Sequence, residues 1–376
     1  MTHTPRLPFL AGLPLAVAAG LLMPVQGRIN GALGAALADG IAAAVVSFTT
    51  GLALMIVISL ALPRGRAGLR GILPAVRERK FPPYYLLAGC IGGFFVFAQS
   101  FTVGLLGVAL FTVATVTGQT LSGLLVDRMG IGPAGKRSIT GIRVIGSILT
   151  VAAVAWAVSP RFSGTGPGPG ELLVPVLLPV LAGFLMSFQQ AMNGTAAVHY
   201  GTPIAATLMN FIAGSVMLWA AWLIKMAVTG PGNALPGEWW YYLGGPLGCV
   251  FIGVGALLVR SLGVLVTGLG MIAGQLLGSL GLDLAFPAPG TVVALPTVLG
   301  TLLTLAAIVL ASLPWPKGRS SGDTAAITRT TPGGHPDADG PETGGARSRQ
   351  AGRLGGAASC TAIIQRRTLL CALLGG

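Results

Sequence analysis

Residues 20–51 read GLLMPVQGRINGALGAALADGIAAAVVSFTTG, and residues 183–214 read GFLMSFQQAMNGTAAVHYGTPIAATLMNFIAG. Aligned without a gap, the two stretches place Gln26 opposite Gln189 and Asn30 opposite Asn193. A chain rich in Ala, Leu and Gly repeats those residues by bias alone, but it does not repeat Gln and Asn in register. The chain therefore contains a duplicated unit.

Two further blocks repeat in the same order. GQTLSGLLVD at residues 118–127 parallels GQLLGSLGLD at residues 274–283, and VIGSILTVAA from Val144 parallels VLGTLLTLAA from Val298. This repetition predicts two homologous halves, residues 1–160 and 172–315, joined by a linker at residues 161–171. We expect the function to be built where the halves meet.

Composition predicts an all-α polytopic membrane protein, with the lipid bilayer as a partner. Hydrophobic residues make up 53% of the chain, charged residues make up 9%, and the mean hydropathy is +0.80. Soluble domains carry about 25% charged residues. The net charge of +13 does not indicate a nucleic-acid partner, because most Lys and Arg residues fall in loops and in the tail. Cys and His residues are too scattered to predict a metal site, and no cofactor is expected.

A membrane span needs about 20 mostly apolar residues, and the chain divides into ten such stretches, five in each half. They lie near residues 9–31, 41–62, 84–103, 107–126, 139–158, 172–195, 203–226, 239–259, 262–282 and 291–313. The first resembles a signal peptide, but the duplication favours its retention, because its copy in the second half is a complete span.

The basic residues orient these spans. With the N-terminus inside, the cytoplasmic side holds nearly all Lys and Arg residues, and only Arg28, Arg161 and Lys225 fall elsewhere. This asymmetry predicts a multi-pass protein of the cytoplasmic membrane with both termini in the cytoplasm. Because five is an odd number, the halves enter the membrane from opposite sides. Such inverted repeats are typical of secondary transporters, which bind solute near the midplane between the repeats.

The composition changes after residue 315 to Gly, Ser, Thr, Pro, Asp and Arg. A segment of this kind cannot bury an apolar core. Residues 316–376 are therefore predicted to form a disordered basic and polar tail.

Residues 8–315 resemble the drug/metabolite transporter superfamily, in particular its bacterial YdcZ-like branch. The resemblance rests on P-x-Q-x-x-x-N, which contains Gln26 and Asn30, on S-F-x-x-G from Ser47, and on GQ-x-L-x-x-L-L-x-D from Gly118. It implies a fold of ten helices in a 5+5 arrangement and solute transport, without a substrate. The second half departs from this pattern, with Ser187 in place of Pro24 and Asn210 in place of Ser47.

Two amide pairs are the first candidates for binding a small-molecule solute. Gln26 and Asn30 are four residues apart, as are Gln189 and Asn193, so a helix places each pair on one face. Uncharged amides can bind a polar solute without a large desolvation cost. The alternative is hydrogen bonding between helices.

Three further residues complete the predicted binding set. Gln119 and Gln275 occupy equivalent positions and are expected to face inward, because lipid would leave an amide unpaired. Gln99 and Asn210 lack matched copies and are expected to be structural. Arg28 either lies buried, where it would favour an anionic solute, or extends to the outer surface.

Asp127 and Asp283 close equivalent helices, at an end where the helix dipole disfavours negative charge. They are therefore candidates for gating ion pairs, with solvated helix ends as the alternative. No Asp or Glu falls deep within a predicted span, which argues against a proton-coupled exporter of organic cations.

The sequence thus predicts a secondary transporter of a small polar metabolite that works by alternating access. A non-transporting membrane scaffold is the main alternative, and a membrane-embedded enzyme is less favoured, because clustered catalytic residues are not visible at membrane depth. The direction of transport, the coupling ion and homodimer formation are left open.

Overall fold

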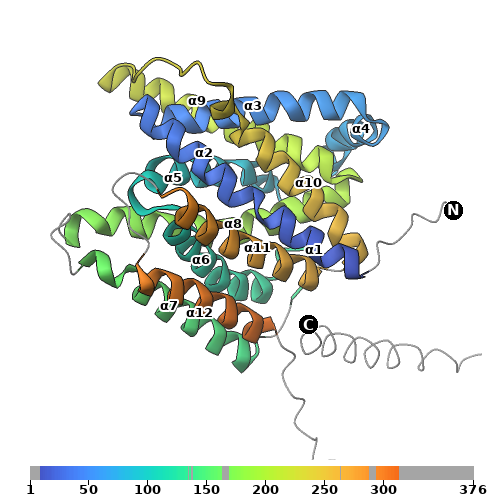
Figure 1. Cartoon of the computed structure of the whole chain (residues 1–376). Helices are drawn as coiled ribbons and strands as arrows, with labels where there is room; N and C mark the ends of the chain where they lie inside the picture. The colour runs from blue at the N-terminus through green and yellow to red at the C-terminus, as the bar shows by residue number, and fades with distance from the viewer. Residues whose placement is uncertain are drawn as a thin grey trace, which may run out of the picture. The chain divides into compact units, whose positions relative to one another are not determined.

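The computed structural model describes residues 9–133, 135–136, 139–162, 169–262, 264–287 and 294–312. These residues form helices joined by short connections, and none of them lies in a β-strand (Figure 1). The helices are α1 (Phe9–Gly20), α2 (Leu22–Leu37), α3 (Gly40–Ala61), α4 (Pro63–Arg77), η1 (Pro83–Leu87), α5 (Ala88–Leu106), α6 (Val108–Met129), α7 (Gly141–Phe162), α8 (Pro169–Tyr200), α9 (Pro203–Thr229), η2 (Trp239–Leu243), α10 (Gly244–Leu262), α11 (Val264–Ala285) and α12 (Leu295–Ser312).

Within the described ranges, seven helices are long and apolar enough to cross a membrane, and the apolar helices Gly141–Ala157 and Leu295–Leu310 are shorter. Each of the ten predicted spans overlaps a helix, but the ten-span arrangement stays a prediction. The prediction of an all-helical membrane protein is confirmed. Residues 163–168 of the predicted linker and the whole predicted tail lie outside the described residues.

The first predicted span is interrupted near its middle. α1 ends at Gly20 and α2 begins at Leu22, just before Pro24. Proline has no N–H to donate to the carbonyl one turn earlier, so the helix ladder loses a hydrogen bond there. The equivalent residue in the second half is Ser187, and α8 continues through it without a break.

α4 is a helix that the span prediction treated as a basic loop. Its arginines are exposed, whereas Gly65, Gly68 and Ala75 are buried. Gly68 lies against Thr202 and Ala205, so that α4 rests on the beginning of α9. An amphipathic helix with Arg on its polar face is suited to the membrane interface.

α3 and α9 pack against each other through equivalent residues of the two repeats. Phe48 and Phe211 have ring centroids 5.0 Å apart. A side chain at Gly51 would collide with the Phe211 ring, and one at Gly214 would collide with the Phe48 ring. The contact is therefore reciprocal, and it lies within the largest cluster of buried apolar residues.

Other helices also pack in corresponding pairs. α6 crosses α8, where Gly118 lies on the backbone of Val180, and α11 crosses α1, where Gly274 lies on the backbone of Val17. α7 and α12, the last helices of the two predicted halves, run side by side (Figure 1).

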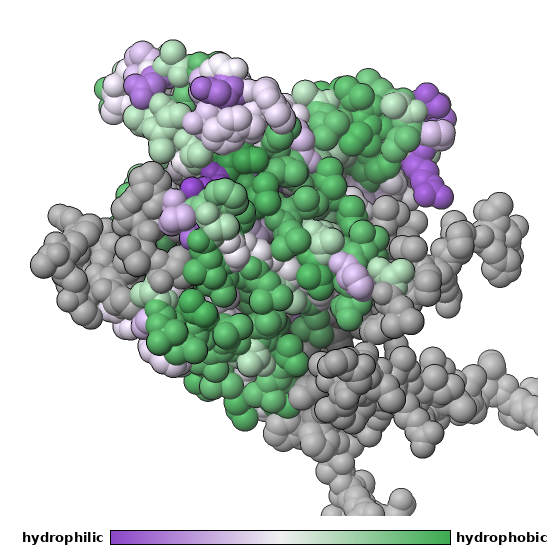
Figure 2. Space-filling view, in the orientation of Figure 1, coloured by the Kyte–Doolittle hydropathy of each residue, from purple (hydrophilic) through white to green (hydrophobic). Residues whose placement is uncertain are grey.

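The outward-facing side chains divide into apolar and polar regions. Figure 2 shows a broad apolar surface over the helices, with polar side chains gathered over α4 and over the segment that follows α9. Such a distribution suits a bundle whose apolar surface faces lipid and whose polar ends face water.

Candidate solute-binding site

A group of buried polar side chains, here called the first amide cluster, consists of Gln26, Asn30, Ser47 and Gln99. They come from α2, α3 and α5, and each is at most 5% exposed. Asn30 Nδ2 donates a hydrogen bond of 3.0 Å to Gln99 Oε1. Two of the predicted site residues therefore lie in one buried cluster, together with two residues that the sequence did not assign to a site.

This cluster has unused hydrogen-bonding capacity. Gln26 Oε1, Asn30 Oδ1 and Ser47 Oγ are buried and have no hydrogen-bond partner among the described residues. A buried polar atom without a partner costs about 1–3 kcal/mol, and such atoms are few in native proteins. A polar solute that supplies donors here would recover that energy.

Helix α10 covers the first amide cluster with glycines. A side chain at Gly244 would collide with Asn30 Oδ1 and would lie 2.9 Å from Ser47 Oγ. A Cβ atom at Gly248 would lie 3.2 Å from Gln26 Oε1 and 3.3 Å from Gln26 Nε2. The backbone of α10 therefore rests directly on the amides, and a shift of this helix would uncover them.

The second amide cluster consists of Gln189, Asn193 and Asn210, from α8 and α9. Gln189 Nε2 donates to Asn210 Oδ1 at 2.7 Å, and Asn193 Nδ2 donates to the same oxygen at 2.9 Å. Asn210 occupies the position equivalent to Ser47. The longer Asn side chain reaches both amides, whereas the shorter Ser47 leaves Asn30 to bond with Gln99.

The structure therefore divides the four predicted amides between two clusters. No hydrogen bond among the described residues joins Gln26 or Asn30 to Gln189 or Asn193. α5 contacts both clusters, because a Cβ at Gly92 would touch Gln189 and Gln99 bonds with Asn30. Gly92 and Gln99 are seven residues apart on this helix, a separation of about 10 Å.

The remaining predicted binding residues lie apart from these clusters. Arg28 donates from Nη2 to the carbonyl of Pro287 at 3.4 Å, beyond the end of α11, and it is partly exposed. Gln119 is partly buried beside α8, where Ser187 Oγ donates to its backbone carbonyl at 3.0 Å. Gln275 is 8% exposed on α11, near Gly20 of α1. Their roles in binding stay predictions.

The two predicted gating residues have different surroundings. Asp127 forms an ion pair of 2.7 Å with Arg143, and both side chains are about one-third exposed. Asp283 is 4% exposed, and its carboxylate accepts hydrogen bonds from the backbone N–H groups of Val108 and Ala109, at 3.0 and 2.7 Å. Asp283 thus caps the N-terminus of α6, which favours negative charge. A gating role for either residue stays a prediction.

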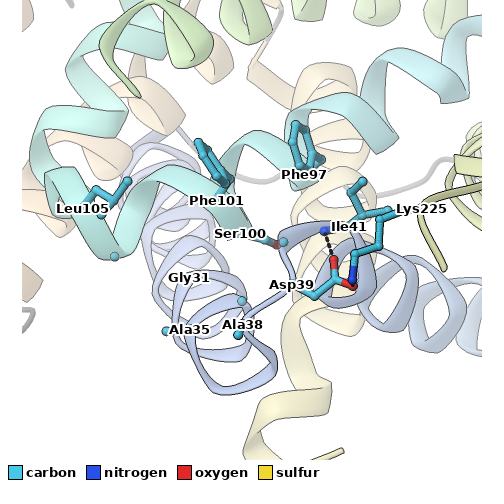
Figure 3. Close-up of a pocket in the computed structure, with 13 residues that line it drawn as sticks. Gly31, Ala35, Ala38, Asp39, Ile41, Phe97, Ser100, Phe101, Leu105 and Lys225 are labelled. Atoms are coloured by element: carbon cyan, nitrogen blue, oxygen red, sulfur yellow. Dashed lines mark hydrogen bonds and ion pairs between the residues drawn. The ribbon is translucent and has the colours of Figure 1, made fainter. Parts of the chain in front are cut away.

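A cavity of about 580 Å³, here called the Lys225 cavity, lies among α2, α3, α5 and α9 (Figure 3). Phe97, Ser100 and Phe101 line it along α5, and Asp39 and Lys225 meet at one end. Its lining includes Gly31 and Ser100, which follow Asn30 and Gln99 directly in the chain.

Asp39 and Lys225 form an ion pair that the sequence did not predict. Lys225 Nζ lies 2.8 Å from Asp39 Oδ2, and the Asp39 side chain is 3% exposed. Burial works against ionisation of Asp39, but Lys225 and the backbone N–H groups of Ala42 and Ile41 hold the pKa of this carboxyl below its usual value. The pair joins the start of α3 to the last part of α9.

A second cavity, here called the Thr202 cavity, has a volume of about 600 Å³. It lies among the end of α3, the start of α9 and the middle of α10. Its lining includes Cys249, which follows Gly248, the glycine that rests on Gln26.

Several residues of these clusters and of the ion pair were not assigned to a site from the sequence, because their sequence signals were weak. Gln99 and Asn210 were visible as amides inside predicted spans, yet their lack of a repeat partner favoured a structural role. Asp39 and Lys225 lie in different halves, and nothing local to either residue identifies the other. Their pairing depends on the packing of α3 against α9.

Long apolar helices that bury clusters of amides suit a protein that works within a membrane. The chain belongs to the family described as "Putative inner membrane exporter, YdcZ", whose model matches residues 11–156 and 174–310. The resemblance predicted from the motifs is confirmed, as is the assignment to membrane transport. No curated protein matches the chain.

Proposed function

We propose that this protein is a secondary transporter that moves a small polar metabolite across the inner membrane by alternating access between two inverted five-helix repeats. The family description supports export as the direction. The observation that carries the proposal is the set of buried polar atoms at Gln26, Asn30 and Ser47 that have no partner in the described part of the chain.

The reciprocal contact between α3 and α9 supports the inversion of the repeats. The start of α3 meets the last part of α9 at Asp39 and Lys225, and the equivalent residues Phe48 and Phe211 meet in between. Equivalent helices that pack antiparallel through equivalent residues are related by a twofold axis perpendicular to them. For helices that cross a membrane, that axis lies in the membrane plane, as in inverted-repeat transporters.

The two cavities support alternating access, because their linings correspond. Asp39, Gly40 and Ile41 line the Lys225 cavity, and the equivalent Thr202, Pro203 and Ile204 line the Thr202 cavity. The cavities thus occupy opposite ends of the antiparallel pair α3 and α9. We infer that each is an opening toward one side of the membrane, with the amides between them.

The ion pair supports a gate at one of the two openings. Lys225 corresponds by repeat position to Leu62, and Asp39 corresponds to Thr202, so the Thr202 cavity lacks the equivalent pair. Asn233 strengthens the closure, because its backbone N–H and its side chain donate to the carbonyls of Leu37 and Ala36, at 3.0 and 2.9 Å. Opening the Lys225 cavity to water would therefore require these polar contacts to break, whereas opening the Thr202 cavity would not.

The test replaces Gln26 by Leu and measures solute binding and counterflow in proteoliposomes. A metabolite panel first identifies a ligand by thermal stabilisation of the purified protein, since a ligand that binds the folded state raises its melting temperature. Gln26→Leu and Gln189→Leu should each lower the affinity for that solute about tenfold or more, because polar groups of the bound solute would lose their partners.

Gln190→Leu provides the matched control, because Gln190 adjoins Gln189 in the chain but is exposed. It should bind solute like the wild type. If Leu at Gln26, Asn30, Gln189 and Asn193 leaves transport unchanged, the amides only join helices and the site lies elsewhere. Absence of counterflow for every solute that binds would favour a scaffold.

A further inference from the structure

The Thr202 cavity differs chemically from its counterpart. Its walls are mostly aliphatic, with Leu54, Ile58, Leu62, Ile204 and Val254 among them. The repeat positions that hold the ion pair in the other cavity are occupied here by Leu62 and Thr202. A polar metabolite gains little from such walls, whereas a hydrocarbon chain gains from each methylene that it buries.

One basic residue, Arg64, lies at the edge of the Thr202 cavity. Arg64 lines the cavity at the start of α4, and its side chain is exposed. Within the described part of the chain, no acidic residue lies within ion-pair distance of Arg64. α4 continues with Arg66 and Arg70, also exposed. Clusters of bases on an interfacial helix attract anionic lipid headgroups.

A polar group inside the cavity also lacks a partner. Thr207 lines the cavity and is 7% exposed, and its hydroxyl makes no hydrogen bond with any described residue. A hydroxyl at this position can donate to an ester carbonyl of a lipid. The cavity thus offers an exposed base and a buried hydroxyl, groups that can bind the phosphate and an ester of a phospholipid.

We propose that the Thr202 cavity binds an anionic phospholipid, with an acyl chain among the aliphatic walls and the phosphate at Arg64. The charge of the rim selects the headgroup, and the cavity volume of about 600 Å³ lies in the range of small-molecule sites. The same cavity is one of the two openings in the proposed function, but lipid binding there does not depend on which solute the amides bind.

The test measures lipid retention by native mass spectrometry on delipidated full-length protein titrated with phosphatidylglycerol or phosphatidylcholine. Wild-type protein should retain phosphatidylglycerol in preference to phosphatidylcholine. Arg64→Ala should lower the affinity for phosphatidylglycerol about fivefold, the effect of one base near a lipid headgroup. Arg77→Ala, at the other end of α4, is the matched control and should have little effect. Arg64→Lys should retain most of the affinity.

A second variant fills the cavity instead of changing its charge. A Cβ at Gly253 would meet no atom within 4 Å, so Gly253→Leu extends into the cavity without a backbone clash. It should abolish retention of both lipids. Gly123→Leu adds the same side chain, also into open space but outside both cavities, and should leave retention unchanged.

Two outcomes would overturn the proposal. One is that Arg64→Ala and Gly253→Leu retain phosphatidylglycerol as the wild type does. The other is that Gly253→Leu blocks solute binding while lipid retention is unchanged, which would leave the cavity to the solute pathway alone.

Discussion

A comparison of Gln99→Leu with Gln26→Leu should show that the Gln99 amide stabilises the bundle, whereas the Gln26 amide is free to bind solute. Gln99 is 2% exposed, and its Oε1 accepts the hydrogen bond from Asn30 Nδ2 at 3.0 Å. Asn30 Oδ1 already lacks a partner, so Gln99→Leu leaves the whole Asn30 amide unpaired. Unpaired buried groups cost about 1–3 kcal/mol, and hydrogen bonds between membrane helices reach about 1.7 kcal/mol. We expect a loss of about 1–2 kcal/mol in the free energy of unfolding.

Gln26→Leu should behave differently in the same assay. The Gln26 side chain makes no hydrogen bond with any described residue, and its Oε1 is buried without a partner. Leu has a similar volume and removes an unpaired polar group. The free energy of unfolding should therefore stay within about 0.5 kcal/mol of the wild type, or increase.

The measurement is reversible unfolding in mixed micelles, followed by circular dichroism across a denaturing detergent titration. The double variant Asn30→Leu/Gln99→Leu provides a control, because removal of both partners should cost less than the sum of the single changes. Equal destabilisation by Gln26→Leu and Gln99→Leu would refute the reasoning, because it would show that Gln26 has a structural partner.

Three other predictions concern charged residues and topology. Asp283→Asn should lower the free energy of unfolding by about 1–2 kcal/mol, because the amide keeps only one of the two acceptor oxygens and loses the negative charge at the start of α6. Asp127→Asn removes only a partly exposed ion pair and should cost less than about 1 kcal/mol. Chemical denaturation compares the two variants. Because the pKa of Asp39 is lowered in the folded protein, its stabilising effect should be complete above about pH 4 and decline as the pH falls further. Lys225→Met should weaken that pH dependence, because it removes one group that lowers the pKa of Asp39 and leaves the backbone N–H groups and the burial in place. A melting-temperature series between about pH 3 and about pH 7 tests this. A reporter fused after Lys317 should be cytoplasmic, and a periplasmic signal would contradict ten spans.

The helical fold could be predicted because its causes act locally. Long apolar stretches must form helices in a membrane, where each backbone group needs an internal partner. Their boundaries at Asp39 and Thr202 follow from side chains that cap the next helix. α4 was missed because its hydropathy is low, and its helix depends on packing of Gly68 and Ala75 on neighbouring segments.

The sequence by itself determined that polar residues recur in register at Gln26, Asn30, Gln189 and Asn193, where chance favours apolar ones, and it predicted a solute site from them. It also determined the family and the membrane environment. Only the tertiary structure decided which partners these residues have: Gln99 for Asn30, Asn210 for the second pair, Lys225 for Asp39 and the start of α6 for Asp283. The physical reason is the separation in sequence between the residues that determine each feature. Hydropathy and helical period are properties of neighbouring residues, whereas a hydrogen bond or an ion pair is satisfied by whichever group the packing of distant helices brings within about 3 Å.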